Sequence, residues 1–292
     1  MTKKVAVHMS DGSIQPVLTD REFKKISAFV YDVCGIKLPP IKKTMLSARL
    51  QKRLRQLRIT SFSDYFSYVL SPEGRAHELP LMIDVVSTNK TDFFREAKHF
   101  DVLTTRVLPD FVKRFAQGNR KLLRVWSAGC SSGEEPYTLA MVLDDFFSKV
   151  AGIDFSILAT DICTEVLAKA EKAVYHDAGL EPIPTRFRYK YLMRGKGQQK
   201  GYHRVVPELR RKVSFQRLNF MDKCFAIDHK MDIIFCRNVI IYFDKKTQAD
   251  LFAKFREQFM AYGYLFIGHS ESLEGPAGQM ERVASAVYKC VK

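Results

Sequence analysis

From Leu122 onward, the sequence alternates short apolar runs with segments of helical periodicity. The runs LLRVWSA and FSILATDI each precede a helical pattern, EEPYTLAMVLDDFF and TEVLAKAEKAV respectively. Two later apolar runs, MDIIFCRNVIIYF and YGYLFIGHS, flank the helical segment KTQADLFAKFREQFM. Such alternation is typical of a doubly wound parallel sheet, because a crossover between parallel strands usually needs a helix. The pattern therefore predicts an α/β domain with a strand at each apolar run.

The region before this domain predicts short amphipathic helices instead. Thr19 and Glu22 form a capping box ahead of apolar residues at helical spacing, and Gly35 marks the end of that first helix. Further helices are expected at Ser61–Leu70 and His77–Val86, joined by a turn in SPEGR. The N-terminal region is therefore predicted to be all-α.

One of these helices has a strongly basic surface. It follows the break at Pro39–Pro40, and its apolar stripe consists of leucines at helical spacing, namely Leu46, Leu50, Leu54 and Leu57. The other faces carry basic residues and no acidic ones: Lys42, Lys43, Arg49, Lys52, Arg53, Arg55 and Arg58. A solvated face usually mixes its signs, so the helix is either an ordinary soluble helix or a surface that docks onto an acidic partner.

The composition excludes several classes of protein. A formal net charge of +15 over 292 residues predicts an acidic partner, such as nucleic acid, an anionic membrane or a glutamate-rich protein. We expect a cytoplasmic protein without membrane insertion, because no apolar run reaches roughly 18 residues and no signal peptide is recognisable. The six cysteines form no CxxC pair, so neither a metal site nor a disulfide framework is expected.

The loop SAGCSSGEEP has the outline of a nucleotide-binding turn. Gly129 and Gly133 would let the backbone approach a ligand at the start of the following helix. Glu134 and Glu135 would repel a phosphate there, and the G-x-G-x-x-G fingerprint is absent. S-adenosylmethionine fits better, since it carries a sulfonium cation and no phosphate. Glutamate in a first helical turn is also ordinary helix design, so the loop alone leaves both explanations open.

Polar residues at two other strand ends point to the same site. Asp161 ends an apolar run where such folds place an acid that accepts hydrogen bonds from ribose hydroxyls, although it could also simply cap the next helix. Arg237 and Asn238 separate two strongly apolar runs, and polar side chains are costly to bury without a purpose. We expect both at the mouth of the strand, facing the site.

Six motifs together resemble the CheR family of chemotaxis methyltransferases. In chain order they are TNKTDFFRE, VWSAGCSSGEEPYTLAM, ATDI, LN, DIIFCRNVIIYFD and GHSES. Members of this family are protein-glutamate O-methyltransferases that use S-adenosylmethionine, yield S-adenosylhomocysteine and methylate chemoreceptors. The resemblance implies a Rossmann-like methyltransferase domain with a small inserted β-subdomain, preceded by an all-α domain. The expected parts are a flexible extension at 1–18, a helical receptor-docking domain at 19–86, a linker contributing to the cofactor site at 87–97, a methyltransferase domain at 98–292 and its β-subdomain at 187–206.

The resemblance also implies roles for individual residues. Arg95 and Tyr242 would handle the substrate. The cofactor site would comprise Asn89, Thr91 and Arg95 of the linker, Gly129 in the loop, Glu135 near the amino-acid and sulfonium end, Asp161 at the ribose, Asn219 and Phe220 by the adenine, and Asn238 and Val239 beside the methyl group.

The acceptor determines the expected mechanism. A glutamate side chain has an unperturbed pKa of about 4.3 and is ionised at neutral pH, so it needs no general base. What the enzyme must supply is in-line alignment, which contributes up to roughly 7–11 kcal/mol in ideal model systems. We therefore hypothesise that Arg95 and Tyr242 orient the carboxylate.

Two contacts with the receptor are expected of a monomeric enzyme. Receptor methylation helices carry an acidic stripe, which the basic helix could meet through Arg49, Lys52, Arg53 and Arg55. Family members that bind a receptor C-terminal pentapeptide by strand addition carry an RGxG-type turn, represented here by Arg194, Gly195 and Gly197. A structural hairpin without a ligand is the alternative for this turn.

Two rival functions remain open. A nucleic-acid methyltransferase would suit the charge, but the chain has neither an NPPY-like nor a Cys-Pro stretch in its CRNVIIYF motif. A non-catalytic receptor-binding regulator would not need Arg95, Asn238 and Tyr242, which are all present.

Overall fold

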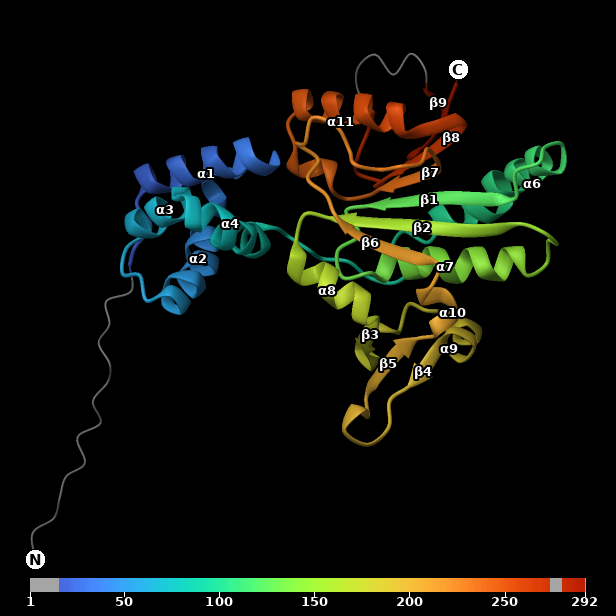
Figure 1. Cartoon of the computed structure of the whole chain (residues 1–292), viewed down its shortest axis with the longest axis horizontal. Coiled ribbons are helices and arrows are strands. Elements are labelled where there is room, and N and C mark those ends of the chain that lie inside the picture. Colours follow the sequence, from blue (N-terminus) through green and yellow to red (C-terminus); the bar gives the residue numbers. More distant parts are fainter. Residues whose placement is uncertain (1–15, 274–279, 292) are drawn as a thin grey trace, which may run out of the picture. The chain divides into compact units, whose positions relative to one another are not determined.

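The computed structural model describes residues 16–273 and 280–291. Most of the extension expected at 1–18 therefore lies outside the described residues. The chain divides into two compact units. The helical unit runs to Phe29 and resumes over Leu38–Val86, and the sheet unit comprises Val30–Lys37 and the chain from Ser87 onward. Figure 1 shows the elements of each unit.

The helical unit contains the predicted helices with one correction. Its elements are α1 (Asp20–Cys34, whose last residues belong to the sheet unit), the 3-10 turn η1 (Pro40–Lys42), α2 (Lys43–Leu57), α3 (Phe62–Leu70) and α4 (Pro72–Val86). The capping box is confirmed, since the Thr19 N–H donates to Glu22 Oε2 at 2.9 Å and the Glu22 N–H to Thr19 Oγ1 at 3.2 Å. The predicted turn in SPEGR is wrong, because Ser71 caps a helix that begins at Pro72 and accepts the Gly74 N–H at 3.0 Å.

A buried carboxylate joins three helices of this unit. Glu78 on α4 accepts two bonds from the Arg53 guanidinium on α2, at 2.9 and 2.6 Å, and one from the Tyr65 hydroxyl on α3 at 2.8 Å. Burial, reinforced by Glu78, raises the pKa of Tyr65. Arg49 also reaches α4, where it donates to the Val86 carbonyl at 2.7 Å. Two residues of the basic helix thus have partners on α4.

The sheet unit is built on a seven-stranded sheet in the order β6-β2-β1-β7-β8-β10-β9. The strands from β6 to β8 pair in parallel, whereas β10 is antiparallel to both β8 and β9. The predicted parallel sheet is therefore confirmed at its four predicted strands, β1, β2, β7 and β8, and it also contains β6, which was not predicted, and an antiparallel edge. The strand bounds are β1 Leu122–Ala128, β2 Asp154–Asp161, β6 Val213–Arg217, β7 Met231–Cys236, β8 Phe259–Ile267, β9 Met280–Ala284 and β10 Val287–Cys290.

Helices cover both faces of this sheet. Figure 1 shows α11 (Lys245–Gln258) on one face and α7 (Glu134–Phe147) with α8 (Thr164–Lys172) on the other. Successive residues of β1 point to opposite faces, so Val125 packs in the α7 core and Trp126 in the α11 core. The remaining helical elements before and between the strands are α5 Lys98–Val102, the π-helix η2 Leu103–Val107, α6 Leu108–Ala116 and α10 Pro207–Arg210. No helix in the described ranges is long and apolar enough to cross a membrane.

The strand predicted after Asn238 is wrong. β7 ends at Cys236, and the apolar run that follows forms the 3-10 turn η5 (Ile240–Tyr242). Asn238 has a φ of 58°, a left-handed conformation that takes the chain out of the strand. The apolar side chains of this run therefore do not extend the sheet.

A separate three-stranded antiparallel sheet has the order β3-β5-β4. Its elements are β3 (Val174–His176), η3 (Asp177–Gly179), α9 (Thr185–Tyr191), β4 (Leu192–Arg194), η4 (Gly197–Gln199) and β5 (Tyr202–Val205). Because β5 pairs with β3, with Tyr175 opposite His203, this sheet takes in residues well before the expected boundary at 187. The expected turn follows β4, where the Gly195 N–H donates to the Tyr202 carbonyl at 2.8 Å and Gly197 has a φ of 57°.

Candidate active site

The order of the strands indicates where a ligand would bind. The chain runs from β1 outward to β2 and β6, and then returns to the other side of β1 as β7. β1 and β7 are parallel, with Ser127 opposite Phe235, so their carboxyl ends lie at one edge of the sheet. Open α/β sheets bind ligands at such a switch point. The sequence patterns had predicted site residues in the loops after β1 and β7.

The loop after β1 is closely packed around two glycines. Gly129 has a φ of 87°, and a Cβ there would lie 2.5 Å from Val239 Cγ2. Gly133 has a φ of 98°, and a Cβ there would lie 2.7 Å from the Tyr175 hydroxyl. Both positions therefore require glycine. The glycines let Val239 and Tyr175 pack directly against the loop backbone, and the approach of a ligand to this backbone stays a prediction.

Asp161 and Asn89 both meet this loop. The Asp161 carboxylate accepts the Ser131 N–H at 2.8 Å and the Cys163 N–H at 3.0 Å. A carboxylate accepts hydrogen bonds, which is the interaction that ribose hydroxyls would need. The Ser131 hydroxyl donates to the Asn89 carbonyl at 2.8 Å, and the Asn89 amide contacts Cys163 Sγ at 3.4 Å. Two residues expected at the cofactor are therefore held at one loop.

A buried arginine joins two carboxylates beside the loop. Arg237, which we expected to face the ligand, has a side chain only 2% exposed and lies between Glu96 at 3.1 Å and Glu135 at 3.2 Å. The Ser127 hydroxyl donates to the other Glu135 oxygen at 2.7 Å. Glu135, expected at the cationic end of the cofactor, is thus fixed at the mouth of β1 by an internal cation.

The surroundings of these two carboxyls move their pKa values in opposite directions. Burial raises the pKa of Glu135, although Arg237 opposes the shift. Burial alone would also raise the pKa of Glu96, but Arg237, the Asn238 amide and the His269 N–H together hold it below its usual value. Glu135 is therefore the carboxyl that would gain more from a nearby ligand cation.

The loop after β7 carries three of the expected site residues, Asn238, Val239 and Tyr242. The Asn238 side-chain amide donates to Glu96 at 3.2 Å, and its backbone N–H donates to Glu271 at 3.0 Å. Val239 packs against Gly129. Tyr242 lies on η5, and its side chain is partly exposed. Val239 is thus brought to the glycine loop, and Asn238 to Glu96 and Glu271.

Arg95 and Thr91 lie in the segment that precedes α5. The Arg95 guanidinium donates to the Lys90 carbonyl at 2.9 Å, and the Arg95 carbonyl accepts from Arg237. The side chains of Arg95 and Thr91 are partly exposed. The backbone of this segment is therefore tied to the buried arginine.

Asn219 and Phe220 follow β6. The Asn219 amide donates to the Val33 carbonyl at 2.7 Å, and its oxygen accepts the Met221 N–H at 3.0 Å. Phe220 belongs to an aromatic cluster with Phe225 and others, with ring centroids 6.2 Å apart. Asn219 thus binds both the neighbouring backbone at Met221 and the distant backbone at Val33.

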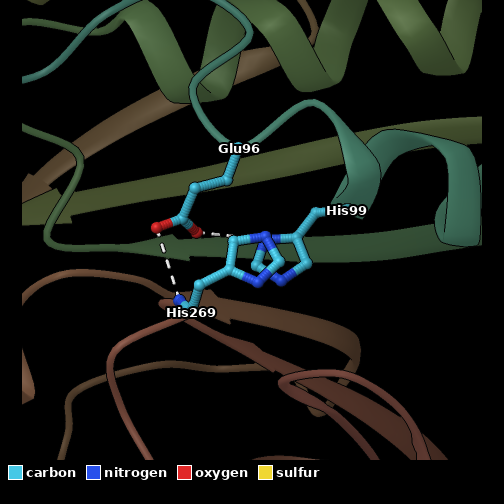
Figure 2. Close-up of side chains that lie close together, drawn as sticks. All are labelled: Glu96, His99 and His269. Carbon is cyan, nitrogen blue, oxygen red and sulfur yellow. Dashed lines mark hydrogen bonds and ion pairs between the residues drawn. The ribbon is translucent and has the colours of Figure 1, made fainter.

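The described residues contain one group with the spacing of metal ligands, Glu96, His99 and His269, whose ligand atoms lie within 4.8 Å of one another (Figure 2). The two imidazole rings are nearly parallel, at 9°, with centroids 4.4 Å apart. Imidazole binds a metal in the plane of its ring, so two stacked rings cannot both bind one ion without rotating. Glu96 is moreover bound to Arg237. The geometry favours a packed histidine pair, and the absence of a metal site stays a prediction.

His99 is kept neutral in this pair. It is 1% exposed, and its Nδ1 lies 3.4 Å from Glu96 Oε2 (Figure 2) without the geometry of a hydrogen bond, so that neither ring nitrogen has a hydrogen-bond partner among the described residues. Burial, helped by Arg237 and His269, lowers the pKa of His99 to about 4.

Backbone strain also concentrates at this site. Among the described residues, eight non-glycine residues have positive φ, and four of these lie in the motif segments, at Phe94, Glu96, Ser131 and Asn238. Each such conformation costs roughly 1–2 kcal/mol and persists only where surrounding contacts hold it.

The sequence analysis missed Glu96 and Glu271. One signal was available: a buried arginine in an apolar run must have acidic partners, and Glu96 lies in a motif already chosen for other reasons. Glu271 lies in the motif GHSES, but its role could not be predicted, because its partners are backbone N–H groups.

Comparison of the sequence with known proteins shows the family to which the chain belongs. Residues 21–87 match the family described as CheR methyltransferase, all-alpha domain, and residues 89–289 match CheR methyltransferase, SAM binding domain. The chemotaxis protein methyltransferase of Borreliella burgdorferi is 38% identical over 273 residues, 93% of this chain and 95% of that protein. Those of Salmonella typhimurium and Escherichia coli are 36% and 38% identical, over 94% and 87% of this chain and 92% and 85% of theirs. The chain therefore belongs to the CheR family and is an S-adenosylmethionine-dependent chemotaxis protein methyltransferase, a protein-glutamate O-methyltransferase.

Proposed function

We propose that the protein methylates glutamate side chains on the cytoplasmic methylation helices of chemoreceptors by alignment alone, without a general base. The observation that carries this proposal is that Asp161 and Val239 contact the glycine loop and Glu135 directly follows it, with Asn238 beside Val239 and with Arg95 and Tyr242 on the flanking segments. An acceptor carboxylate is already ionised at neutral pH, so orienting it is sufficient. Arg95 would bind one carboxylate oxygen, and the Tyr242 hydroxyl would donate to the acceptor.

The residues present fit S-adenosylmethionine. When bound, it supplies a methyl group on a positively charged sulfur. Asp161 places a carboxylate, the acceptor that ribose hydroxyls require, beside the glycine loop, and Glu135 is an ionisable carboxyl with burial-raised pKa that a cation would stabilise. Asn89, Thr91, Asn219, Phe220 and Val239 would complete the binding site, and Gly129 would let the backbone approach. The side chains of Glu134 and Glu135 would disfavour a phosphate-bearing cofactor.

The reaction class is tested with radiolabelled S-adenosylmethionine and receptor membranes, followed by treatment with base. Carboxyl methyl esters release labelled methanol, methylated nucleic-acid bases keep their label, and a non-catalytic regulator yields none. The three outcomes separate the proposed function from both rivals.

The alignment roles are tested by Arg95→Ala and Tyr242→Phe. Each is expected to lower kcat by on the order of 10-fold to 100-fold, because misplacing a reactant by about 1 Å costs that much. Arg106→Ala, at an exposed arginine on η2, is the matched control. An Arg95→Ala enzyme with normal kcat and normal cofactor affinity would show that Arg95 has no such role.

The basic helix is proposed to dock onto the acidic stripe of the methylation helices through Arg49, Lys52, Arg53 and Arg55. Lys52 and Arg55 are exposed, whereas Arg49 and Arg53 also bind α4. Exposed ion pairs contribute only about 0.2–1 kcal/mol each and are screened by salt. We therefore expect the receptor KM to rise with ionic strength and with the double reversal Lys52→Glu and Arg55→Glu. If the receptor KM changes neither with ionic strength nor in the double reversal variant, the basic helix does not dock onto the receptor.

The three-stranded sheet is proposed to bind a receptor C-terminal pentapeptide. β4 is an edge strand, with exposed Met193 and Arg194, and it ends at the Gly195–Gly197 turn. A peptide strand added at this edge would raise the effective concentration of the receptor without touching the chemistry. Calorimetric titration with a receptor tail peptide tests this, with Arg194→Ala as the weakened variant. No heat at millimolar peptide would leave the sheet a purely structural element.

We further propose that the enzyme is a cytoplasmic monomer that acts on protein and not on nucleic acid. The acidic partner expected from its charge would then be the receptor itself. Sedimentation at micromolar concentration would test the monomer.

A further inference from the structure

A buried carboxylate holds together the two loops that end β7 and β8. Glu271 is 8% exposed. Its Oε2 accepts the Gly268 N–H at 2.6 Å and the Asn238 N–H at 3.0 Å, and its Oε1 accepts the Ile241 N–H at 3.3 Å. Three backbone donors from two different loops thus converge on one side chain.

The packing around this carboxylate leaves it little freedom. A Cβ on Gly268 would lie 2.8 Å from Glu271 Oε2 and 2.7 Å from the Asn238 side-chain nitrogen. Burial raises the pKa of Glu271, and the three N–H groups oppose that shift. Buried backbone N–H groups without a partner are costly, so the loops need this acceptor in place.

The two oxygens hold different parts of the β7 loop. Oε2 fixes Asn238, which is followed by Val239, and Val239 packs on Gly129. Oε1 fixes Ile241, the residue before Tyr242. One end of the loop therefore belongs to the cofactor side of the site and the other to the acceptor side.

We propose that Glu271 is a positioning residue for methyl transfer, which sets the place of Tyr242 relative to the glycine loop. The proposal rests on the roles proposed above for Asn238, Val239 and Tyr242. Glu271 acts only through the backbone of residues 238–242 and does not touch the reacting atoms.

The substitution Glu271→Gln separates the two oxygens. The amide oxygen is expected at the Oε2 position, where it keeps two N–H bonds, and the amide nitrogen then meets the Ile241 N–H, donor against donor. We expect kcat to fall by on the order of 10-fold to 100-fold while cofactor affinity changes by less than about twofold. Glu271→Ala, which removes both oxygens, should weaken cofactor binding as well.

A readout without cofactor is amide hydrogen exchange in the free protein. Glu271→Gln should speed exchange at Ile241 at least tenfold and leave Asn238 protected. Asp232→Asn is the matched control, because Asp232 is another buried carboxylate, at the opposite end of β7, and binds Arg120 and the Arg124 N–H. It should lower the melting temperature without changing kcat.

Each outcome decides the question. Normal kcat in Glu271→Gln, or a loss of melting temperature alone as in Asp232→Asn, would overturn the positioning role. Tyr242→Phe is measured alongside to keep the two proposals distinct. If Tyr242→Phe retains full kcat while Glu271→Gln loses it, the positioning role stands and only the role of the Tyr242 hydroxyl fails.

Discussion

Replacing Arg237 by methionine would leave two buried carboxylates without their shared cation. The Arg237 side chain is 2% exposed, and those of its partners Glu96 and Glu135 are 17% and 12% exposed. Removing one member of a buried ion pair typically destabilises a protein by about 3–5 kcal/mol. Each carboxylate keeps another donor, from Asn238 or Ser127, so we expect the lower end, about 3 kcal/mol at pH 8.

The stability that Arg237→Met loses should depend on pH. Without Arg237, burial raises the folded-state pKa of both carboxyls above their unfolded values. A group with a raised folded pKa is favourable at low pH, and its contribution is lost as pH rises. The deficit of Arg237→Met relative to the wild type should therefore shrink between pH 8 and pH 5, as the carboxyls take up protons.

Urea unfolding followed by tryptophan fluorescence is the assay. The chain has one tryptophan, Trp126, which is fully buried in β1 and so reports on the sheet unit. The double variant Arg237→Met, Glu135→Gln should recover roughly half of the loss, because one buried charge is gone. A cost below about 1 kcal/mol, a cost independent of pH, or no recovery in the double variant would refute the reasoning.

Three further predictions follow from other contacts. Gly129→Ala should lower cofactor affinity at least tenfold, measured by calorimetry, because the new Cβ meets Val239 at a positive φ, and adding Val239→Ala should restore only part of the affinity. The contribution of His99 to the free energy of unfolding should fall by roughly 2 kcal/mol from pH 7 to pH 5, because its folded pKa is about 4 against 6.5 unfolded, and the pH dependence of His99→Gln should differ from that of the wild type by this amount. Arg53→Gln should lower the free energy of unfolding of the helical unit by about 3 kcal/mol, followed by far-UV circular dichroism, because the buried Glu78 carboxylate loses its cation. The substitution Lys52→Gln, at an exposed position, should stay within about 0.5 kcal/mol of the wild type.

Local patterns predicted much of the fold. The run LLRVWSA became β1 and EEPYTLAMVLDDFF became α7 with the expected ends, because a glycine loop separates a short apolar run from a helical pattern. The run after Asn238 failed, since apolar content alone cannot distinguish a strand from a 3-10 turn, and the positive φ at Asn238 is held by distant Glu96 and Glu271.

Long-range pairs explain what was missed at the site. The sequence showed a basic helix without acidic residues, but the acid that binds Arg53 comes from another helix, at Glu78. Arg237 was recognised as costly to bury, yet its partners Glu96 and Glu135 come from segments 141 and 102 residues away. Sequence patterns and spacings report on residues that are close along the chain. Contacts between residues more than 100 positions apart depend on how the strands and helices are arranged, which those patterns do not contain.

The left-handed residues described at the active site also bear on engineering. A designer seeking a more heat-resistant enzyme would replace strained non-glycine positions with glycine, and would find Glu96 and Asn238 among them, where the same change removes a hydrogen-bonding side chain. Arg58, at the end of α2, and Tyr262 share the strain at exposed surface positions. Glycine substitutions at Arg58 and Tyr262 could therefore raise the thermal stability while the conformation of the motif loops at the active site stays unchanged.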